Sequence, residues 1–423
     1  MWAQISDNNP YSRFGIGELN NTNFSHLQQM GDLGASYADP YHINIVNPAT
    51  LANLRTAAFD VGLFTEYSTL SDGNQESTSF NGNLAYLSLA FPLKNPVNEL
   101  FDRIESDFSH GMAFTIMPHS TVGYNIRSTE NIDSIGSVVR DFTGSGGTYK
   151  FLFSNGFKYK NFSAGINLGY LFGKIRNERS VEFSDIFNVF GVDYENNYSV
   201  KGFLWNLGLH YSLVLNQKEI DQKKGVPSKV FNFGLYGNSA TRFSTSSNVE
   251  NFIVNELTGS LDTVEILQDN LGNGKLPAEL GLGATYFKGN KWALGVNYSI
   301  TFWNKYRNDA NPETLTNANK LSLGGYFRPN YKSFDKYFER VMYRFGAYYN
   351  NDPRSVNAEQ LNNYGVTFGF GMPFVYQKKI SHANIGFNIG KKGGNTPIRE
   401  TFYRLTFGFT FNDDEWFIKR KYY

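Results

Sequence analysis

The chain of 423 residues contains no cysteine. Disulfides, thiolate catalysis, cysteine-ligated metals and a lipidated N-terminal cysteine are therefore excluded. An excess of charge is also missing, because 39 basic and 38 acidic side chains leave a formal net charge of +1. Nucleic acid is not an expected partner, since it requires a basic patch or stripe.

Long apolar runs are missing as well. No uninterrupted apolar stretch reaches the length of about 18 residues that a helical membrane span needs. The mean hydropathy of −0.40 still permits a transmembrane barrel, because a barrel carries its apolar side chains at alternate positions. The opening residues 1–4 are too short for a signal peptide and fit the remainder of a cleaved one.

Catalytic and metal-binding patterns are not found in the sequence. None of the six histidines stands at metal-ligand spacing from another histidine or a carboxylate. We find no nucleophile elbow, P-loop or dinucleotide fingerprint. The glycine-rich stretch 143–147 precedes a predicted strand, which indicates a kink or loop end rather than a phosphate site. We therefore expect no enzyme, no cofactor and no metal.

Aromatic residues and glycine are abundant, with 38 Phe, 27 Tyr and 41 Gly, a composition that favours strands and tight turns. From about residue 56 onward, apolar residues alternate with small or polar ones. Phe162 and Leu168, for example, fall on one face of a predicted strand, and Ser163 and Asn167 on the other. The pattern predicts fourteen strands at 56–70, 78–92, 110–127, 148–159, 161–178, 196–216, 229–247, 278–289, 291–304, 317–328, 341–351, 362–376, 380–390 and 399–412.

The connections between these strands fall into two classes. Short basic turns are predicted at 158–161, 288–291 and 377–380, and mostly long polar loops at 128–147, 179–195, 248–277, 305–316, 352–361 and 391–398. Outer-membrane barrels have short periplasmic turns and long external loops. We therefore predict an all-β, antiparallel transmembrane barrel in the cell outer membrane, with both termini periplasmic. A propeller would repeat a signature every roughly 40–50 residues, and a sandwich would carry charges on its solvated face.

The first 55 residues show no strand alternation. A fourteen-strand barrel is too wide for its own side chains to fill, so we predict a plug at 1–55, a barrel at 56–412 and a periplasmic tail at 413–423. Charged strand residues should face the lumen, because charge facing lipid at mid-depth costs roughly 2–4 kcal/mol. Salt bridges to the plug and contact with a ligand headgroup are the two roles open to them. The luminal candidates are Asp60, Glu66, Arg127, His210, Glu279, Arg328, Arg344, His382, Glu400 and Arg404.

Residues 31–39 (GDLGASYAD) and 47–52 (NPATLA) resemble the hatch signature of the FadL/TodX family of outer-membrane transporters for hydrophobic molecules. The resemblance implies a fourteen-stranded barrel with an N-terminal hatch. Thr50 stands where the family has glycine, and residues 40–42 replace its acidic and small stretch. The two ends of the chain resemble members from Bacteroidota, which are related to PorV-like barrels. The hatch-motif candidates are Gly34, Ala38, Asp39, Asn47, Pro48 and Ala49.

Two functions fit this sequence, and outer-membrane lipid is an expected partner in both. The first, which the sequence favours, is a FadL-like channel for uptake of fatty-acid-like hydrophobic small molecules, with an apolar luminal site gated by the hatch. The second is a non-transporting accessory or scaffold barrel in a larger Bacteroidota outer-membrane complex, for secretion or barrel assembly. Protein subunits would be partners in that case. A general porin is disfavoured by the plug.

The end of the chain is aromatic and basic. Such a segment serves either as an assembly signal or interfacial anchor, or as a docking peptide, since aromatic and arginine side chains dominate interface energies. The docking candidates are Trp416, Phe417, Arg420, Tyr422 and Tyr423.

Overall fold

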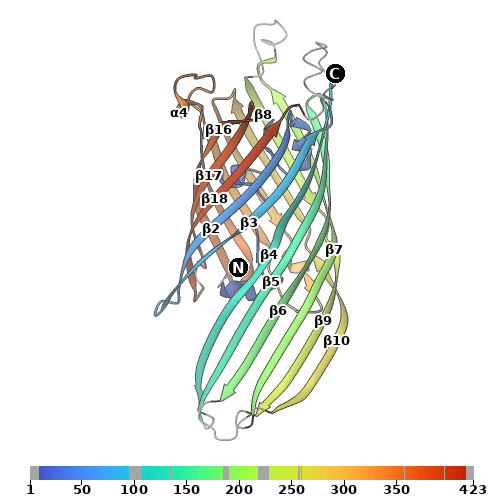
Figure 1. The fold of residues 1–423 in the computed structure, drawn as a ribbon, viewed down its shortest axis with the longest axis vertical. Helices are drawn as coiled ribbons and strands as arrows, with labels where there is room; N and C mark the ends of the chain where they lie inside the picture. Colours follow the sequence, from blue (N-terminus) through green and yellow to red (C-terminus); the bar gives the residue numbers. More distant parts are fainter. Residues whose placement is uncertain are drawn as a thin grey trace.

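A computed structural model describes residues 9–94, 107–133, 136–183, 190–217, 228–255, 258, 260–356, 358–394 and 396–415. Most of them form a closed antiparallel β-barrel of fourteen wall strands (Figure 1), which confirms the predicted fold class. No helix in these ranges is long and apolar enough to cross a membrane.

All fourteen predicted strands are present, and two are interrupted. In the first, β8 (Lys229–Asn238) continues as β9 (Thr241–Asn255); in the second, β10 (Leu261–Leu276) continues as β11 (Glu279–Lys288). The uninterrupted strands are β2 (Ala57–Ser71), β3 (Glu76–Pro92), β4 (Phe108–Ile132), β5 (Gly136–Tyr159), β6 (Phe162–Phe183), β7 (Phe190–Val214), β12 (Trp292–Thr301), β14 (Ala318–Phe327), β15 (Met342–Val356), β16 (Glu359–Tyr376), β17 (Lys379–Lys392) and β18 (Arg399–Asp413). The last strand closes on the first, with Asp413 opposite Ala57.

The two faces of the wall differ as the alternation predicts. On β6, Phe162 and Leu168 point outward and are 49% and 38% exposed, whereas Ser163 and Asn167 point inward and are buried. A soluble sheet would bury the apolar face. Here the apolar face is outside, as in a barrel surrounded by lipid.

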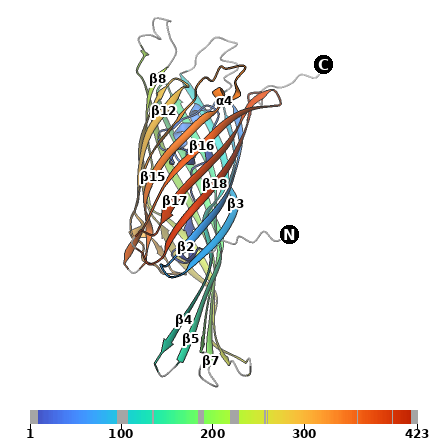
Figure 2. The same cartoon turned by 90° about the vertical axis from the view of Figure 1, so that its left-hand side faces the viewer.

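Four of the predicted loops are mostly strand, so the predictions at 128–147, 179–195, 248–277 and 352–361 are wrong. The strands β4 to β7, β9 and β10 continue past the ends of β2, β3, β17 and β18 as an open sheet, which we call the extension (Figures 1 and 2). Residues 261–271 of β10 are exposed along their whole length. Alternation is not visible there, because neither face is lined by lipid and the polar composition resembles a loop.

Residues 9–55, the luminal segment, contact the inner side of the wall. They contain η1 (Pro10–Arg13), β1 (Glu18–Leu19), α1 (Ser25–Gln28) and η2 (Pro48–Asn53). The helix α1 contacts β17 and β18, and η2 contacts β4 to β7, on the other side of the barrel. Phe24 of this segment stacks on Tyr86 of β3 with ring centroids 3.8 Å apart. Of the twelve largest fully buried side chains in the described residues, ten belong to this segment.

A ring of glycines lets this segment approach the wall. Gly156 lies opposite both Gly111 and Gly165 in the register of the sheet. A Cβ atom on Gly165 would lie 2.5 Å from the backbone nitrogen of Ala49, a distance that real Cβ atoms do not reach. At each position of the ring, a side chain would push the segment away from the wall. We call this ring the glycine girdle; it comprises Gly111, Gly156, Gly165, Gly208, Gly234, Gly283, Gly324, Gly346, Gly369, Gly386 and Gly408.

The wall has a seam between β3 and β4. Residues 87–92 pair with 111–116, and in the described part of the chain the rest of β3 pairs with β2 alone. The free edge of β4 receives the luminal segment instead. Glu18 lies opposite Thr121, and the backbone nitrogen of Asn9 donates to the oxygen of Gly123 at 2.9 Å. The luminal segment therefore continues the hydrogen bonding where β3 departs.

Candidate functional site

The Asn-Pro-Ala part of the hatch motif joins a helix cap to the wall. The side-chain oxygen of Asn47 accepts from the backbone nitrogen of Ala49 at 3.2 Å, and Pro48 occupies the first position of η2. The amide nitrogen of Asn47 donates to the oxygens of Ala35 at 2.6 Å and Leu209 at 3.0 Å. Asparagine is required here because it serves as cap and as cross-link at once.

The glycine and acidic parts of the motif shape the preceding loop. A Cβ atom on Gly34 would lie 2.9 Å from the side chain of Val46. Asp39 accepts from the backbone nitrogen of Tyr41 at 2.8 Å and contacts Nδ1 of His42 at 3.1 Å. Burial by itself raises the pKa of Asp39, but His42 lowers it well below its usual range. Ala38 precedes this carboxylate and is half-buried.

Three histidines meet beside Asp39, although they are far apart in the sequence. The ring of His42 lies 4.7 Å from that of His26 and 4.8 Å from that of His382, measured between centroids. Both ring nitrogens of His26 are buried, and within the described ranges neither has a hydrogen-bond partner. Burial lowers the pKa of His26 well below its ordinary value. Nowhere in those ranges do three or more His, Cys, Asp or Glu side chains form a group that could hold a metal ion.

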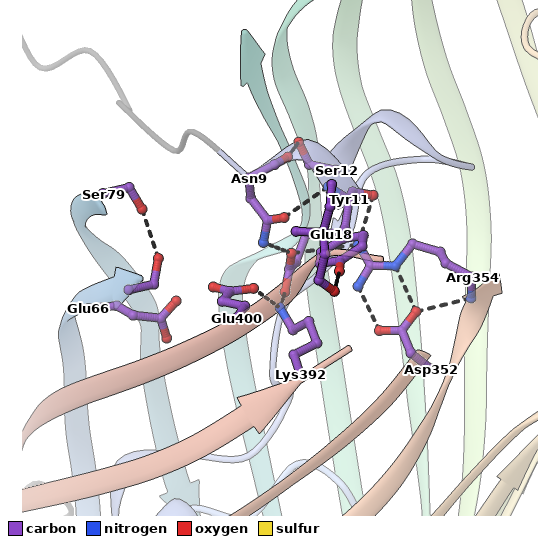
Figure 3. Close-up of polar contacts among 12 residues, drawn as sticks. Asn9, Tyr11, Ser12, Glu18, Glu66, Ser79, Asp352, Arg354, Lys392 and Glu400 are labelled. Atoms are coloured by element: carbon purple, nitrogen blue, oxygen red, sulfur yellow. Dashed lines mark hydrogen bonds and ion pairs between the residues drawn. The ribbon is translucent and has the colours of Figure 1, made fainter. Parts of the chain in front are cut away.

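A buried charge network ties the luminal segment to the last strands (Figure 3). Glu18 is paired with Lys392 of β17 and lies 3.6 Å from Arg354 of β15. Lys392 also contacts Glu400 of β18 at 3.3 Å. Arg354 binds both carboxylate oxygens of Asp352 at 2.6 Å. Charges this deeply buried are tolerated when each is paired and hydrogen-bonded.

The pKa of Glu18 reflects this environment. Burial raises it, but Lys392 and Arg354 outweigh burial and lower the pKa to about 2. Glu18 is therefore ionised at neutral pH and held between two cations. The same segment forms a second ion pair, between Asp32 and Lys320 of β14.

Several predicted luminal residues do face the luminal segment. Arg344 donates to the side-chain oxygen of Gln29 at 2.9 Å, and Nε2 of His210 lies 3.3 Å from the oxygen of Ser36. His382 and Glu400 take part in the clusters described above. Arg328 is half-buried and lines a second cavity together with Asp39 and Arg55 of the luminal segment.

The remaining predicted residues pair within the wall or lie elsewhere. Asp60 accepts from the Thr410 hydroxyl at 2.9 Å, and Arg404 donates to Glu66 at 2.6 Å. Glu279 accepts from the Tyr236 hydroxyl at 3.3 Å. Arg127 is not luminal: its side chain is 68% exposed on the extension, where it pairs with Asp141. Its predicted direction is wrong because β4 has already left the barrel at this point.

Four members of the charge network were not predicted. Asp352, Arg354 and Lys392 fall in segments that the composition assigns to loops, and Glu18 falls in the segment without alternation. Strand parity could have found Lys392, since it lies an even number of residues from His382. The docking candidates Trp416, Phe417, Arg420, Tyr422 and Tyr423 lie outside the described residues.

A cavity of about 390 Å³ remains between the luminal segment and the wall. The predicted luminal site is apolar, but this cavity is lined mostly by polar and charged side chains, including those of Asp32, Glu66, Lys150, Glu279 and Lys320. An aliphatic ligand would therefore contact these polar groups as well as apolar side chains such as Leu204 and Trp205.

Fourteen antiparallel strands, an apolar outer surface and a segment packed inside define an outer-membrane barrel with the FadL/TodX-like fold. The chain is similar to a Pseudomonas aeruginosa FadL homologue, with a TM-score of 0.58, 13% identity and coverage of 94% of this chain and 99% of that one. It is also similar to the Ralstonia pickettii toluene transporter TbuX, with a TM-score of 0.57, 12% identity and coverage of 92% and 98%. A third similar structure is the CymD monoaromatic hydrocarbon channel, with a TM-score of 0.55, 14% identity and coverage of 94% and 98%.

The family model BamG matches residues 1–423, so the chain belongs to the BamG family. No curated protein sequence matches it.

Proposed function

We propose that this barrel is a non-transporting accessory subunit of a larger outer-membrane complex of Bacteroidota, one that secretes proteins or assembles barrels. The observation that carries the proposal is the way the lumen is filled. Glu18, Asp32 and Asn47 each bind the luminal segment to a different part of the wall. A gate would have to release these contacts, and breaking one buried ion pair costs about 3–5 kcal/mol.

The outer surface supports the same proposal. The exposed edge strand β10 of the extension carries Leu261, Ile266 and Leu271, which are 63%, 49% and 82% exposed. A long, exposed edge strand with apolar side chains among its polar ones is a surface for pairing with another chain. A rigid barrel that presents such a sheet suits a scaffold better than a conduit.

The proposal includes an orientation. The short turns at Lys160, Gly289 and Lys378 would be periplasmic, as would the start of β2 and the end of β18, and the extension would face the cell exterior. The even number of strands supports this arrangement, since the wall begins and ends at the same end of the barrel. The first described residues lie at the other end, where Tyr11 donates to the oxygen of Ile398 in the connection before β18.

Native purification tests the proposal. The chain is tagged at its chromosomal locus, extracted in mild detergent and purified alongside an unrelated tagged outer-membrane barrel. We expect protein subunits in near-stoichiometric amounts with this chain and not with the control. A preparation that contains this chain and lipid alone would contradict the scaffold function.

Uptake of hydrophobic small molecules, with the luminal segment acting as hatch, is the second candidate. It is favoured by the seam between β3 and β4, which offers a lateral route through the wall, and by the fold shared with proteins described as hydrocarbon channels. Cells without the gene should then take up radiolabelled oleate or toluene more slowly, and the intact gene should restore the rate. Equal uptake in both strains would rule this candidate out.

A further inference from the structure

The charged side chains that line the luminal cavity form ion pairs, with two exceptions. Within the described chain, every other charged residue of the lining has an ion-pair partner, as in Asp32 with Lys320 and Glu66 with Arg404. Lys150 and Glu279 have none, and they carry opposite charges.

The environment of Lys150 favours the binding of an anion. It lies on β5, its side chain points inward, and it is 8% exposed. Its ammonium donates to the hydroxyl of Thr22 at 3.0 Å, and within the described residues that neutral contact is its single hydrogen bond. A buried ammonium with one neutral partner is far from satisfied, since it has three protons to donate and a large desolvation cost to offset.

Glu279 is the counterpart on another part of the wall. It stands at the start of β11, beside the break after β10, and its described contact is the hydroxyl of Tyr236 at 3.3 Å. Lys150 and Glu279 line the same cavity and are close enough for their charges to attract each other, but in the described chain they form no direct ion pair. The space between them is therefore bounded by a cation on one side and a carboxylate on the other.

Two amide side chains line the cavity from β6 and β7, the strands that follow the strand of Lys150 in the wall. Asn167 and Asn206 use their amide nitrogens to bind the backbone oxygens of Ile45 and Val46. Their side-chain oxygens are left as acceptors with no partner in the described chain. Acceptors in this position suit N–H groups of a ligand.

We propose that this cavity binds a small zwitterion, an amino acid or short peptide, with its carboxylate on Lys150 and its ammonium towards Glu279. The volume of about 390 Å³ lies in the range of small-molecule sites. The amide oxygens accept from the ammonium or from peptide N–H groups. This site is independent of whether the barrel acts as scaffold or channel.

Calorimetric titration of the full-length protein in detergent tests the proposal. The probes are glycine, diglycine and triglycine, a series that varies the separation of the two charges. N-acetyldiglycine, which has no cation, diglycinamide, which has no carboxylate, and the neutral sugar maltose are the comparison compounds. We expect one zwitterion of the series to bind at least about tenfold more tightly than the comparison compounds. No saturable binding of any zwitterion would mean that the cavity holds water alone, and tighter binding of maltose would mean a sugar site; either result overturns the proposal.

Two variants assign the charges. Lys150→Met should remove the preference for diglycine over diglycinamide, and Glu279→Gln should remove the preference for diglycine over N-acetyldiglycine, if diglycine is the member that binds. Lys174→Met and Glu250→Gln change exposed or half-buried charges outside this cavity and should keep both preferences. Retained heat-modifiable migration in gels verifies that each variant is folded. Folded variants that keep the preferences of the parent would overturn the assignment, because a purely structural role would not discriminate between charged and blocked ligands.

Discussion

Replacing Glu18 by Gln should loosen the luminal segment without unfolding the barrel. Glu18 is the residue through which β1 reaches both Lys392 and Arg354. Glutamine has nearly the same size, so the change removes the charge and leaves the packing in place. The wall strands keep their own hydrogen bonds, which do not involve this side chain.

The expected loss is about 3 kcal/mol. Removing one member of a buried ion pair costs about 3–5 kcal/mol, and the lower end applies because Lys392 retains Glu400 and Arg354 retains Asp352. The pKa of Glu18, lowered from 4.5 to about 2, leads to a similar value. Each tenfold change in proton affinity corresponds to about 1.4 kcal/mol.

Hydrogen exchange followed by mass spectrometry measures this loss locally. Peptides that cover residues 9–24 should lose about two orders of magnitude in protection, while peptides from β5 and β6 should keep theirs. Glu130→Gln is the matched control, since Glu130 pairs with Arg140 on the extension and its side chain is 59% exposed. An exposed pair of this kind contributes less than about 1 kcal/mol. If residues 9–24 of Glu18→Gln exchange at the rate of the parent, the charge network does not hold the segment.

Four further predictions follow from the same contacts. Single-channel conductance in planar bilayers should rise as the pH falls from about 4.5 towards 2. The lowered pKa of Glu18 means that its ionised form stabilises the luminal segment above the ordinary pKa, and this stabilisation is lost as the pH falls through the folded value. Glu18→Gln should conduct at all pH values, and a parent conductance that does not change with pH would contradict the prediction. In hydrogen exchange, His26→Phe should raise the free energy of local opening of residues 23–30 by about 1–3 kcal/mol, since it removes two buried nitrogens without partners. It should also remove the loss of stability below about pH 6.5 that a buried neutral histidine causes, and a less protected variant would contradict the packing. Deleting residues 4–50 should leave a barrel that inserts and conducts small solutes. Gly165→Val should also conduct, but combining it with the deletion should not raise the conductance further. If the two effects add, the glycine girdle acts on conductance by a route other than the position of the luminal segment. Cysteine at Gly73 should react with an impermeant maleimide on intact cells, whereas cysteine at Lys378 should not, and the reverse pattern would invert the proposed orientation.

The sequence by itself determined the barrel wall. Strands such as β6 present large apolar side chains to lipid and small polar ones to the lumen, so their period of two is visible in the residues, and all fourteen strands could be predicted. The Asn-Pro-Ala motif was visible for a similar reason. Its cap depends on residues adjacent in the chain, from Asn47 to Ala49.

The tertiary structure alone decided the rest. In the extension both faces lack lipid, so no periodicity marks β10 or the end of β4, and Arg127 was placed on the wrong side. The glycine girdle is invisible as such, because its members are spread from Gly111 to Gly408 and become a ring through the register of the barrel. Glu18 meets Lys392 across more than 370 residues, and no local pattern encodes a pair whose partners are brought together by closing a barrel around its own N-terminal segment.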